Sequence, residues 1–91
     1  MKILLLEDDI LLNESITKYL TTVGHALTSV RDGNVCLEIL VKEKFDLLIF
    51  DINVPNIDGL SILEILHAQK KITPVIFIST LIDIEDISRA F

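Results

Sequence analysis

The sequence predicts an α/β domain built on a doubly wound parallel sheet, with helices on both faces. The first observation is a set of short, uninterrupted apolar runs at residues 3–6, 47–50 and 75–78. Runs of this kind are typical of strands that are buried on both faces of a parallel sheet. The second observation is that longer segments with apolar residues at helical spacing separate the runs. Right-handed crossovers between successive parallel strands then distribute the helices over both faces.

The first half of the chain predicts two strands and two helices. A strand at residues 3–6 is followed by a helix at 10–23, a shorter and more polar strand at 26–30, and a helix at 35–44. The polar strand is placed at an edge of the sheet. The predicted apolar faces of the two helices consist of Leu12, Ile16, Tyr19, Leu20 and Val23 in the first, and Leu37, Leu40 and Val41 in the second.

The second half of the chain repeats the alternation. A strand at residues 47–50 leads to a helix at 59–70, and a strand at 75–78 leads to a last helix that begins near Asp83 and runs to residue 91. The predicted apolar face of the helix at 59–70 consists of Leu60, Leu63 and Leu66, widened by Ile62 and Ile65. The complete order is four strands, each followed by a helix.

Composition limits the class of protein. A chain of 91 residues forms one domain, and its net charge of −6 argues against direct binding to nucleic acid. No apolar stretch approaches the roughly 18 residues that a membrane span needs. The single cysteine, Cys36, cannot form an internal disulfide, so we expect a cytoplasmic protein with this residue in its core. His25 and His67 are expected at the surface, because no second metal ligand lies at a useful spacing.

Polar residues follow three of the predicted strands. Glu7 and Asp8 follow the first strand, Asp51 the third and Ser79 the fourth. Two simpler explanations stay open: Asp8 and Asp9 suit a helix N-terminus, and a strand can simply end at a polar residue. If the strands are neighbours, however, the carboxylates converge at the edge where open α/β sheets bind ligands. Converging carboxylates favour a cation, and a set of oxygen ligands suits Mg²⁺.

Four segments together resemble the receiver domain of a two-component response regulator. They are MKILLLEDD, VRDG, LLIFDINVPNIDG and TPVIFIST, in the family's order and spacing, and they span essentially the whole chain. The resemblance implies a flavodoxin-like fold with strand order 2-1-3-4-5. It also implies phosphorelay signalling, with a sensor histidine kinase as partner and Mg²⁺ as cofactor.

The resemblance assigns roles to the residues at this edge. Asp51 matches the phosphoacceptor, whose carboxylate takes a phosphoryl group from the phosphohistidine of the kinase. Asp8 matches the residue that binds Mg²⁺ directly, and Glu7 matches one that binds it through water. Asn53 would add its main-chain carbonyl to the metal site. Ser79 would donate its hydroxyl to a phosphoryl oxygen and swing inward as the domain switches.

The family pattern also implies what the domain controls. A Glu-Asp pair in place of Asp-Asp is similar to the subfamily that fuses the receiver to a DNA-binding domain, so transcription regulation by such a domain is the expected output. The domain itself is not expected to be an enzyme in the usual sense, since it catalyses only its own phosphoryl transfer and dephosphorylation.

Two features depart from the family pattern. The family has a lysine at the end of a fifth strand and then a fifth helix, and the sequence ends before either. Residues 1–91 are therefore interpreted as a receiver domain that is incomplete at its C-terminus. Thr80 stands where the family usually has a smaller residue, and its branched side chain would narrow access to the phosphoryl group.

Two other classes of protein share part of this pattern. A haloacid-dehalogenase-type phosphatase also has a nucleophilic aspartate after a strand, but it needs a second aspartate two residues later. Asn53 occupies that position and cannot transfer the proton. A receiver-like module that acts only through protein–protein contacts, without phosphorylation, stays open as the alternative.

The strand at residues 75–78 predicts self-association. In the order 2-1-3-4 it lies at an edge of the sheet, and its sequence, VIFI, has no lysine or proline to discourage pairing. We expect a homodimer in which two such strands pair or the last helices exchange. The alternative is that the helix from Asp83 to Phe91 folds over this edge and keeps the protein monomeric.

Overall fold

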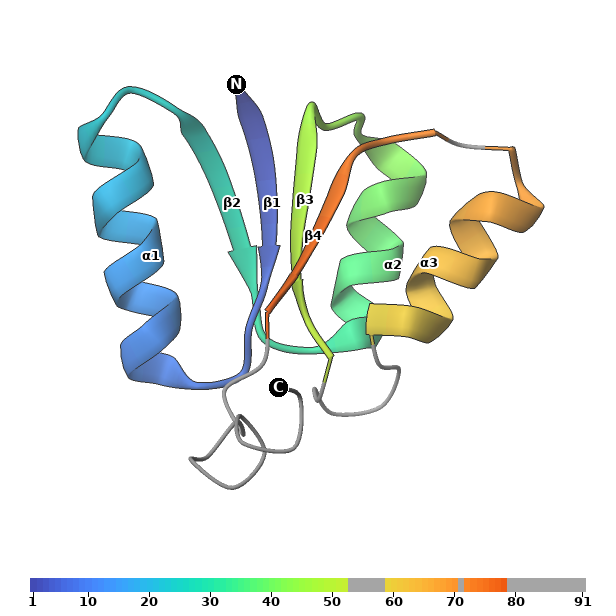
Figure 1. Ribbon diagram of the computed structural model, residues 1–91, viewed down its shortest axis with the longest axis horizontal. Coiled ribbons are helices and arrows are strands. Elements are labelled where there is room, and N and C mark those ends of the chain that lie inside the picture. The colour runs from blue at the N-terminus through green and yellow to red at the C-terminus, as the bar shows by residue number, and fades with distance from the viewer. Residues whose placement is uncertain (53–58, 71, 79–91) are drawn as a thin grey trace, which may run out of the picture.

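The fold is a four-stranded parallel sheet flanked by helices (Figure 1). The computed structural model describes residues 1–52, 59–70 and 72–78. The strands are β1 (Lys2–Leu6), β2 (Ala26–Val30), β3 (Leu47–Asp51) and β4 (Val75–Ile78). They are arranged in the order β2-β1-β3-β4, and every neighbouring pair is parallel. The doubly wound, flavodoxin-like arrangement expected from the sequence is confirmed.

The helices cover both faces of the sheet. Helix α1 (Ile10–Thr22) lies on one side, and helices α2 (Gly33–Lys42) and α3 (Gly59–Ala68) lie on the other (Figure 1). Asp9 and Asp32 are the N-caps of α1 and α2, and their side chains accept hydrogen bonds from main-chain N–H groups of the first turn. Because Asp32 caps it, α2 begins at Gly33 and not at the predicted residue 35.

The core is concentrated between the sheet and the pair α2 and α3. All of residues 3–6 in β1 are buried, as the unbroken apolar run predicted. The main cluster contains Leu4, Leu6, Val30, Cys36, Phe45, Leu48, Phe50, Ile62 and Leu66. Phe50 also packs edge-to-face on Phe77 of β4, with ring centroids 6.4 Å apart. Each side chain fully buried in this way stabilises the fold by about 1.5–3 kcal/mol.

The predicted faces of the helices were too wide. In α1 the inward stripe is centred on Asn13, Ile16 and Leu20, so that Tyr19 and Val23 lie beyond its margin and are mostly exposed. The prediction was wrong in the same way for Val41 in α2, and for Leu60 and Ile65 in α3, which are all exposed. The buried residues of α2 and α3 are Gly33, Cys36, Gly59, Ile62 and Leu66, and the partly buried Leu37, Ile39 and Leu40 also pack against the core. A single helix packed on a sheet buries only a narrow stripe.

Helix ends also differ slightly from the prediction. α2 ends at Lys42 and α3 at Ala68, each two residues before the predicted end. Lys70 follows α3 with a φ of 59°, a left-handed conformation that terminates a helix. The predicted last helix from Asp83 lies outside the described residues. Within the described part of the chain, none of the helices has the length and apolar character to cross a membrane.

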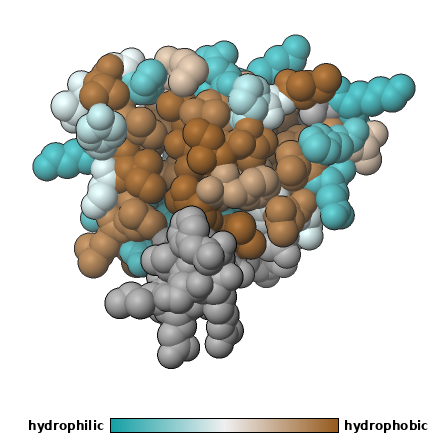
Figure 2. Space-filling model, in the orientation of Figure 1, coloured by the Kyte–Doolittle hydropathy of each residue, from teal (hydrophilic) through white to brown (hydrophobic). Residues whose placement is uncertain are grey.

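Strand β4 pairs with β3 alone among the described residues. Its Ile76 side chain is 51% exposed, whereas no residue of the run 3–6 in β1 is more than 1% exposed. In the orientation of Figure 1, hydrophobic residues gather in the middle of the molecular surface (Figure 2). This part of the described surface therefore has the apolar character expected of a contact surface.

Candidate functional site

The acidic residues predicted to form a site lie together at the carboxyl edge of the sheet. β1 and β3 are parallel neighbours with Leu6 opposite Phe50, so the next residues along each strand, Glu7 and Asp51, lie side by side. One carboxylate oxygen from each of Glu7, Asp8 and Asp51 lies within 4.8 Å of the others. Glu7 and Asp51 are fully buried, while Asp8 is exposed. The cluster therefore has a buried floor and one solvent-facing carboxylate.

Glu7 is held by its own main chain and by its neighbours. Its N–H donates to the Val30 carbonyl at 3.0 Å, and its Oε2 accepts a hydrogen bond from the Asp9 N–H at 3.1 Å. The other carboxylate oxygen, Oε1, is buried and has no hydrogen-bond partner among residues 1–52, 59–70 and 72–78. Burying a carboxylate oxygen without a hydrogen-bond partner is unfavourable, and binding a cation would compensate for the missing bond.

The two acidic residues after Glu7 have different functions in the structure. The Asp9 Oδ1 accepts the N–H of Leu12 at 3.0 Å and so caps α1. The explanation that both Asp8 and Asp9 serve the helix N-terminus is therefore supported for Asp9. Asp8 lies in the carboxylate cluster instead.

Electrostatics support a cation at the cluster. Burial raises the pKa of Glu7 to about 7, and the neighbouring Asp51 carboxylate adds to the shift. In the absence of a cation the cluster thus resists carrying its full negative charge at neutral pH. The donors are all carboxylate oxygens, and exposed Asp8 leaves one side open to water. This combination fits Mg²⁺, which takes a few carboxylates and retains several waters.

Two residues that support this site were missed from the sequence. Asn13, in the second turn of α1, is buried and donates from Nδ2 to the Glu7 carbonyl at 3.0 Å. Gly59 begins α3 so close to β3 that an added Cβ would lie 2.9 Å from the Asp51 carbonyl oxygen. The sequence signal for Asn13 is a polar residue within the apolar stripe of a helix. The signal for Gly59 is a glycine at the start of a helix.

Two predicted site residues lie outside the described part of the chain. They are Asn53, predicted to offer its main-chain carbonyl to the metal, and Ser79, predicted to donate its hydroxyl to a phosphoryl oxygen. Thr80 lies outside it as well. Their functions stay predictions.

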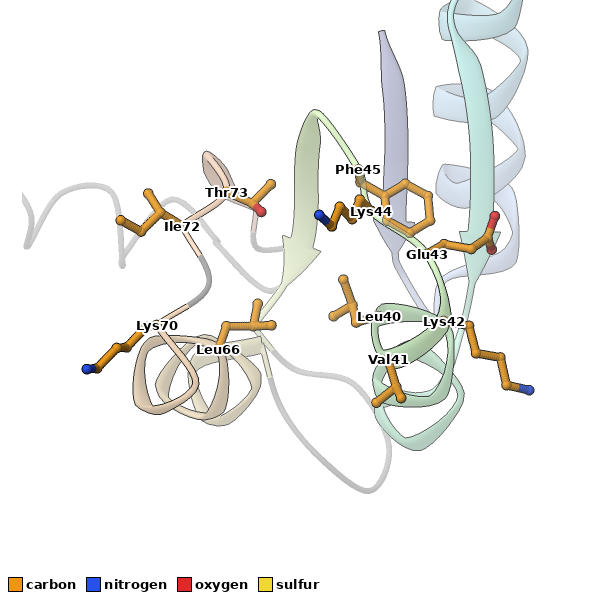
Figure 3. A pocket seen from close by; sticks show the side chains of 10 residues that line it. All are labelled: Leu40, Val41, Lys42, Glu43, Lys44, Phe45, Leu66, Lys70, Ile72 and Thr73. Atoms are coloured by element: carbon orange, nitrogen blue, oxygen red, sulfur yellow. The ribbon is translucent and has the colours of Figure 1, made fainter.

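A separate hollow lies at the opposite end of the sheet (Figure 3). It has a volume of about 490 Å³ and is lined by the end of α2, the start of β3 and the segment after α3. Its lining includes Leu40, Phe45, Leu66, the highly exposed Ile72 and Lys44 (Figure 3). It contains none of the three clustered carboxylates, so we do not assign it to the site.

The strand order is β2-β1-β3-β4, a buried aspartate ends β3, and two more carboxylates follow β1. These features together are those of a receiver domain. The family model for the response regulator receiver domain matches residues 3–91. The chain belongs to this family, whose members act in two-component signal transduction.

Individual relatives agree with this assignment. The transcriptional regulatory protein CrdR of Helicobacter pylori is 38% identical over 91 residues, which are 99% of this chain and 43% of CrdR. This chain therefore spans less than half of that relative.

Solved structures show the same fold. The receiver domain of the Francisella response regulator 1452 has a TM-score of 0.84 and 31% identity, over 97% of this chain and 73% of that one. The Thermotoga maritima response regulator TrrA, solved in complex with Mg²⁺–BeF, has a TM-score of 0.79 and 26% identity, over 86% of this chain and 68% of that one.

Proposed function

We propose that Asp51 accepts a phosphoryl group from a sensor histidine kinase in a Mg²⁺-dependent reaction. The observation that carries this proposal is the buried Asp51 carboxylate at the end of β3, clustered with Glu7 and the exposed Asp8. Membership in the receiver family supports the reaction type. The Mg²⁺–BeF complex of TrrA supports the choice of metal.

The chemistry at Asp51 is nucleophilic substitution at phosphorus. A carboxylate oxygen attacks the phosphorus atom, the P–N bond to the histidine of the kinase breaks, and its electron pair returns to the imidazole. The product is an acyl phosphate on Asp51. Hydrolysis of that bond by water, assisted by the domain itself, restores the carboxylate.

The other acidic residues prepare the site for this step. Glu7, Asp8 and Asp51 would hold Mg²⁺, which supplies positive charge to balance the phosphoryl oxygens. The hydrogen bond from the Asp9 N–H keeps Glu7 Oε2 in place, and burial around Glu7 and Asp51 limits water near the nucleophile. We extend the proposal to the main-chain carbonyl of Asn53 as a further metal ligand. We likewise propose the Ser79 hydroxyl as a donor to a phosphoryl oxygen.

The output of the domain is proposed from its relatives. CrdR is a transcriptional regulatory protein, and this chain covers 43% of its length. We propose that residues 1–91 form the receiver part of a cytoplasmic response regulator, and that phosphorylation controls transcription through a DNA-binding domain.

Incubation with Mg²⁺ and acetyl phosphate tests the proposal against the inert-module alternative. We expect a base-labile phosphoryl group on the wild-type protein, and none in the presence of EDTA or in the Asp51→Asn variant. Asp46→Asn is the matched control, because it makes the same chemical change in an exposed residue just before β3. Absence of phosphoryl uptake by the folded wild-type protein would support a module that acts only through protein contacts.

A further inference from the structure

Asn13 is a polar residue on the inward face of α1, where helical spacing predicts apolar side chains. It is 7% exposed and is the one buried residue of α1. Its side chain points back from the second turn of the helix to the ends of β1 and β2. Burying a primary amide is unfavourable unless its donors and acceptor are satisfied, so its contacts indicate its function.

The amide of Asn13 connects two strands at the acidic edge. Its Nδ2 donates to the Glu7 carbonyl at 3.0 Å and to the Val30 carbonyl at 3.4 Å. The Val30 carbonyl also accepts the Glu7 N–H, at 3.0 Å. The Asn13 Oδ1 in turn accepts the Thr17 hydroxyl at 3.4 Å. Asn13 and Val30 therefore hold both main-chain polar groups of Glu7.

We propose that Asn13 is a positioning residue for the metal site, an inference that rests on the proposed Mg²⁺-dependent function. By fixing the Glu7 carbonyl, Asn13 fixes the direction in which the chain leaves β1, and hence the positions of the Glu7 and Asp8 carboxylates relative to Asp51. Residues that orient metal ligands typically change metal affinity about 10–100-fold when they are replaced. Asn13 itself does not touch the metal or the phosphoryl group.

A purely structural function for Asn13 predicts something different. If the amide only joined α1 to the sheet, its loss would lower stability and leave the Mg²⁺ affinity of the folded protein unchanged. The two functions are therefore separated by measuring metal affinity and stability in the same set of variants.

The experiment uses the wild-type chain and the variants Asn13→Leu and Asn13→Ala. Both variants lack the amide donor, but the first keeps a side chain that branches at Cγ and leaves no cavity. Mg²⁺ dissociation constants are measured by titration calorimetry, unfolding free energies by urea denaturation, and hydrogen exchange of the Glu7 amide by NMR in the absence of metal. A third test variant, Thr17→Val, removes the hydroxyl that donates to Asn13 Oδ1. The control variant is Ile39→Ala, which removes an apolar side chain of α2 that packs against the core.

We expect both Asn13 variants to bind Mg²⁺ about tenfold or more weakly and to exchange the Glu7 amide faster. Ile39→Ala should lower stability without changing the Mg²⁺ dissociation constant of the folded protein. Wild-type Mg²⁺ affinity in a folded Asn13→Leu variant would overturn the positioning function while leaving the proposed function intact. Failure of the wild-type protein to bind Mg²⁺ would overturn both.

If neither Asn13 variant folds, Mg²⁺ affinity and exchange of the Glu7 amide are compared between the wild type and Thr17→Val. Removing the bond to Asn13 Oδ1 should then raise the Mg²⁺ dissociation constant measurably and speed exchange at Glu7. An unchanged dissociation constant together with unchanged exchange in that variant would count against the positioning function.

Discussion

Glu7 and Asp51 lie side by side at the ends of adjacent parallel strands, and both carboxylates are fully buried. Together with exposed Asp8, they bring three carboxylate oxygens within 4.8 Å of one another. Two buried carboxylates at such separation are unfavourable unless one is protonated or a cation is bound.

Replacing Asp51 by Asn should weaken Mg²⁺ binding on the order of tenfold, because the cluster loses one of its charged ligands. Isothermal titration of wild type and variant measures the change directly. The Asp46→Asn variant should retain wild-type affinity, because Asp46 precedes β3 at the opposite end of the strand from Asp51. Equal Mg²⁺ affinity in the wild type and in Asp51→Asn would contradict the assignment of the site.

The stability of the metal-free protein should fall as pH rises from about 5 to about 7.5. Burial and Asp51 raise the pKa of Glu7 in the folded state to about 7, above its ordinary value of 4.5. The folded state therefore binds a proton more tightly than the unfolded state, and this advantage disappears when Glu7 ionises. The loss should be on the order of 2 kcal/mol.

Urea denaturation at a series of pH values, with EDTA present, measures this trend. Glu7→Gln should flatten it, since glutamine does not titrate, and saturating Mg²⁺ should reduce it, since the metal favours the ionised carboxylate. A Glu7→Gln variant with an unchanged pH dependence would show that another group is responsible.

Gly59→Ala should reduce both stability and metal affinity. The added Cβ would lie 2.9 Å from the Asp51 carbonyl oxygen and 3.1 Å from the Phe50 Cβ, so α3 and the end of β3 must separate. Overpacking of this kind destabilises by about 1–3 kcal/mol. Urea denaturation and Mg²⁺ titration provide the two measurements.

Gly24→Ala is the control for this substitution. Gly24 has a φ of +102° and open space around its Cα, so alanine there lowers stability through backbone strain alone. We expect it to leave Mg²⁺ affinity unchanged. If Gly59→Ala also left the affinity unchanged, the close approach of α3 would have no bearing on the site.

The 91-residue polypeptide should self-associate through β4. Among the described residues this strand pairs only with β3, and Ile76 is half exposed. Unpaired main-chain groups that become buried cost about 1–3 kcal/mol each, and pairing with a second copy satisfies them. Sedimentation equilibrium at micromolar concentration should show a dimer for the wild type and a monomer for Ile76→Lys. A wild-type monomer at all concentrations would rule the dimer out.

The strands were more predictable from the sequence than the helix faces. β2 and β4 have the predicted bounds, and β1 and β3 are each one residue longer. An interior strand is apolar along nearly its whole length, so the first polar residue, such as Lys2 or Asp51, lies at its end. A helix on a sheet buries only one stripe of its surface. Apolar residues beside that stripe, such as Tyr19 and Val41, are exposed, and including them made the predicted faces too wide.

The acidic cluster was predictable because it depends on strand ends and strand order. Once β1 and β3 are parallel neighbours, Glu7 and Asp51 must meet. Asn13 and Gly59 were not predictable in the same way. The contacts of Asn13 reach from α1 to the ends of β1 and β2, and those of Gly59 reach to β3 and β4, which only the folded chain brings together.

The most direct test of the account is to locate the phosphoryl group. The protein is phosphorylated with acetyl phosphate and Mg²⁺, the acyl phosphate is trapped by reduction with borohydride, and the peptides are sequenced by mass spectrometry. We predict homoserine, the product of reducing an aspartyl phosphate, at position 51 and at no other carboxylate. Label at Glu7, Asp8 or any residue other than Asp51 would contradict the assignment of Asp51 as the phosphoacceptor.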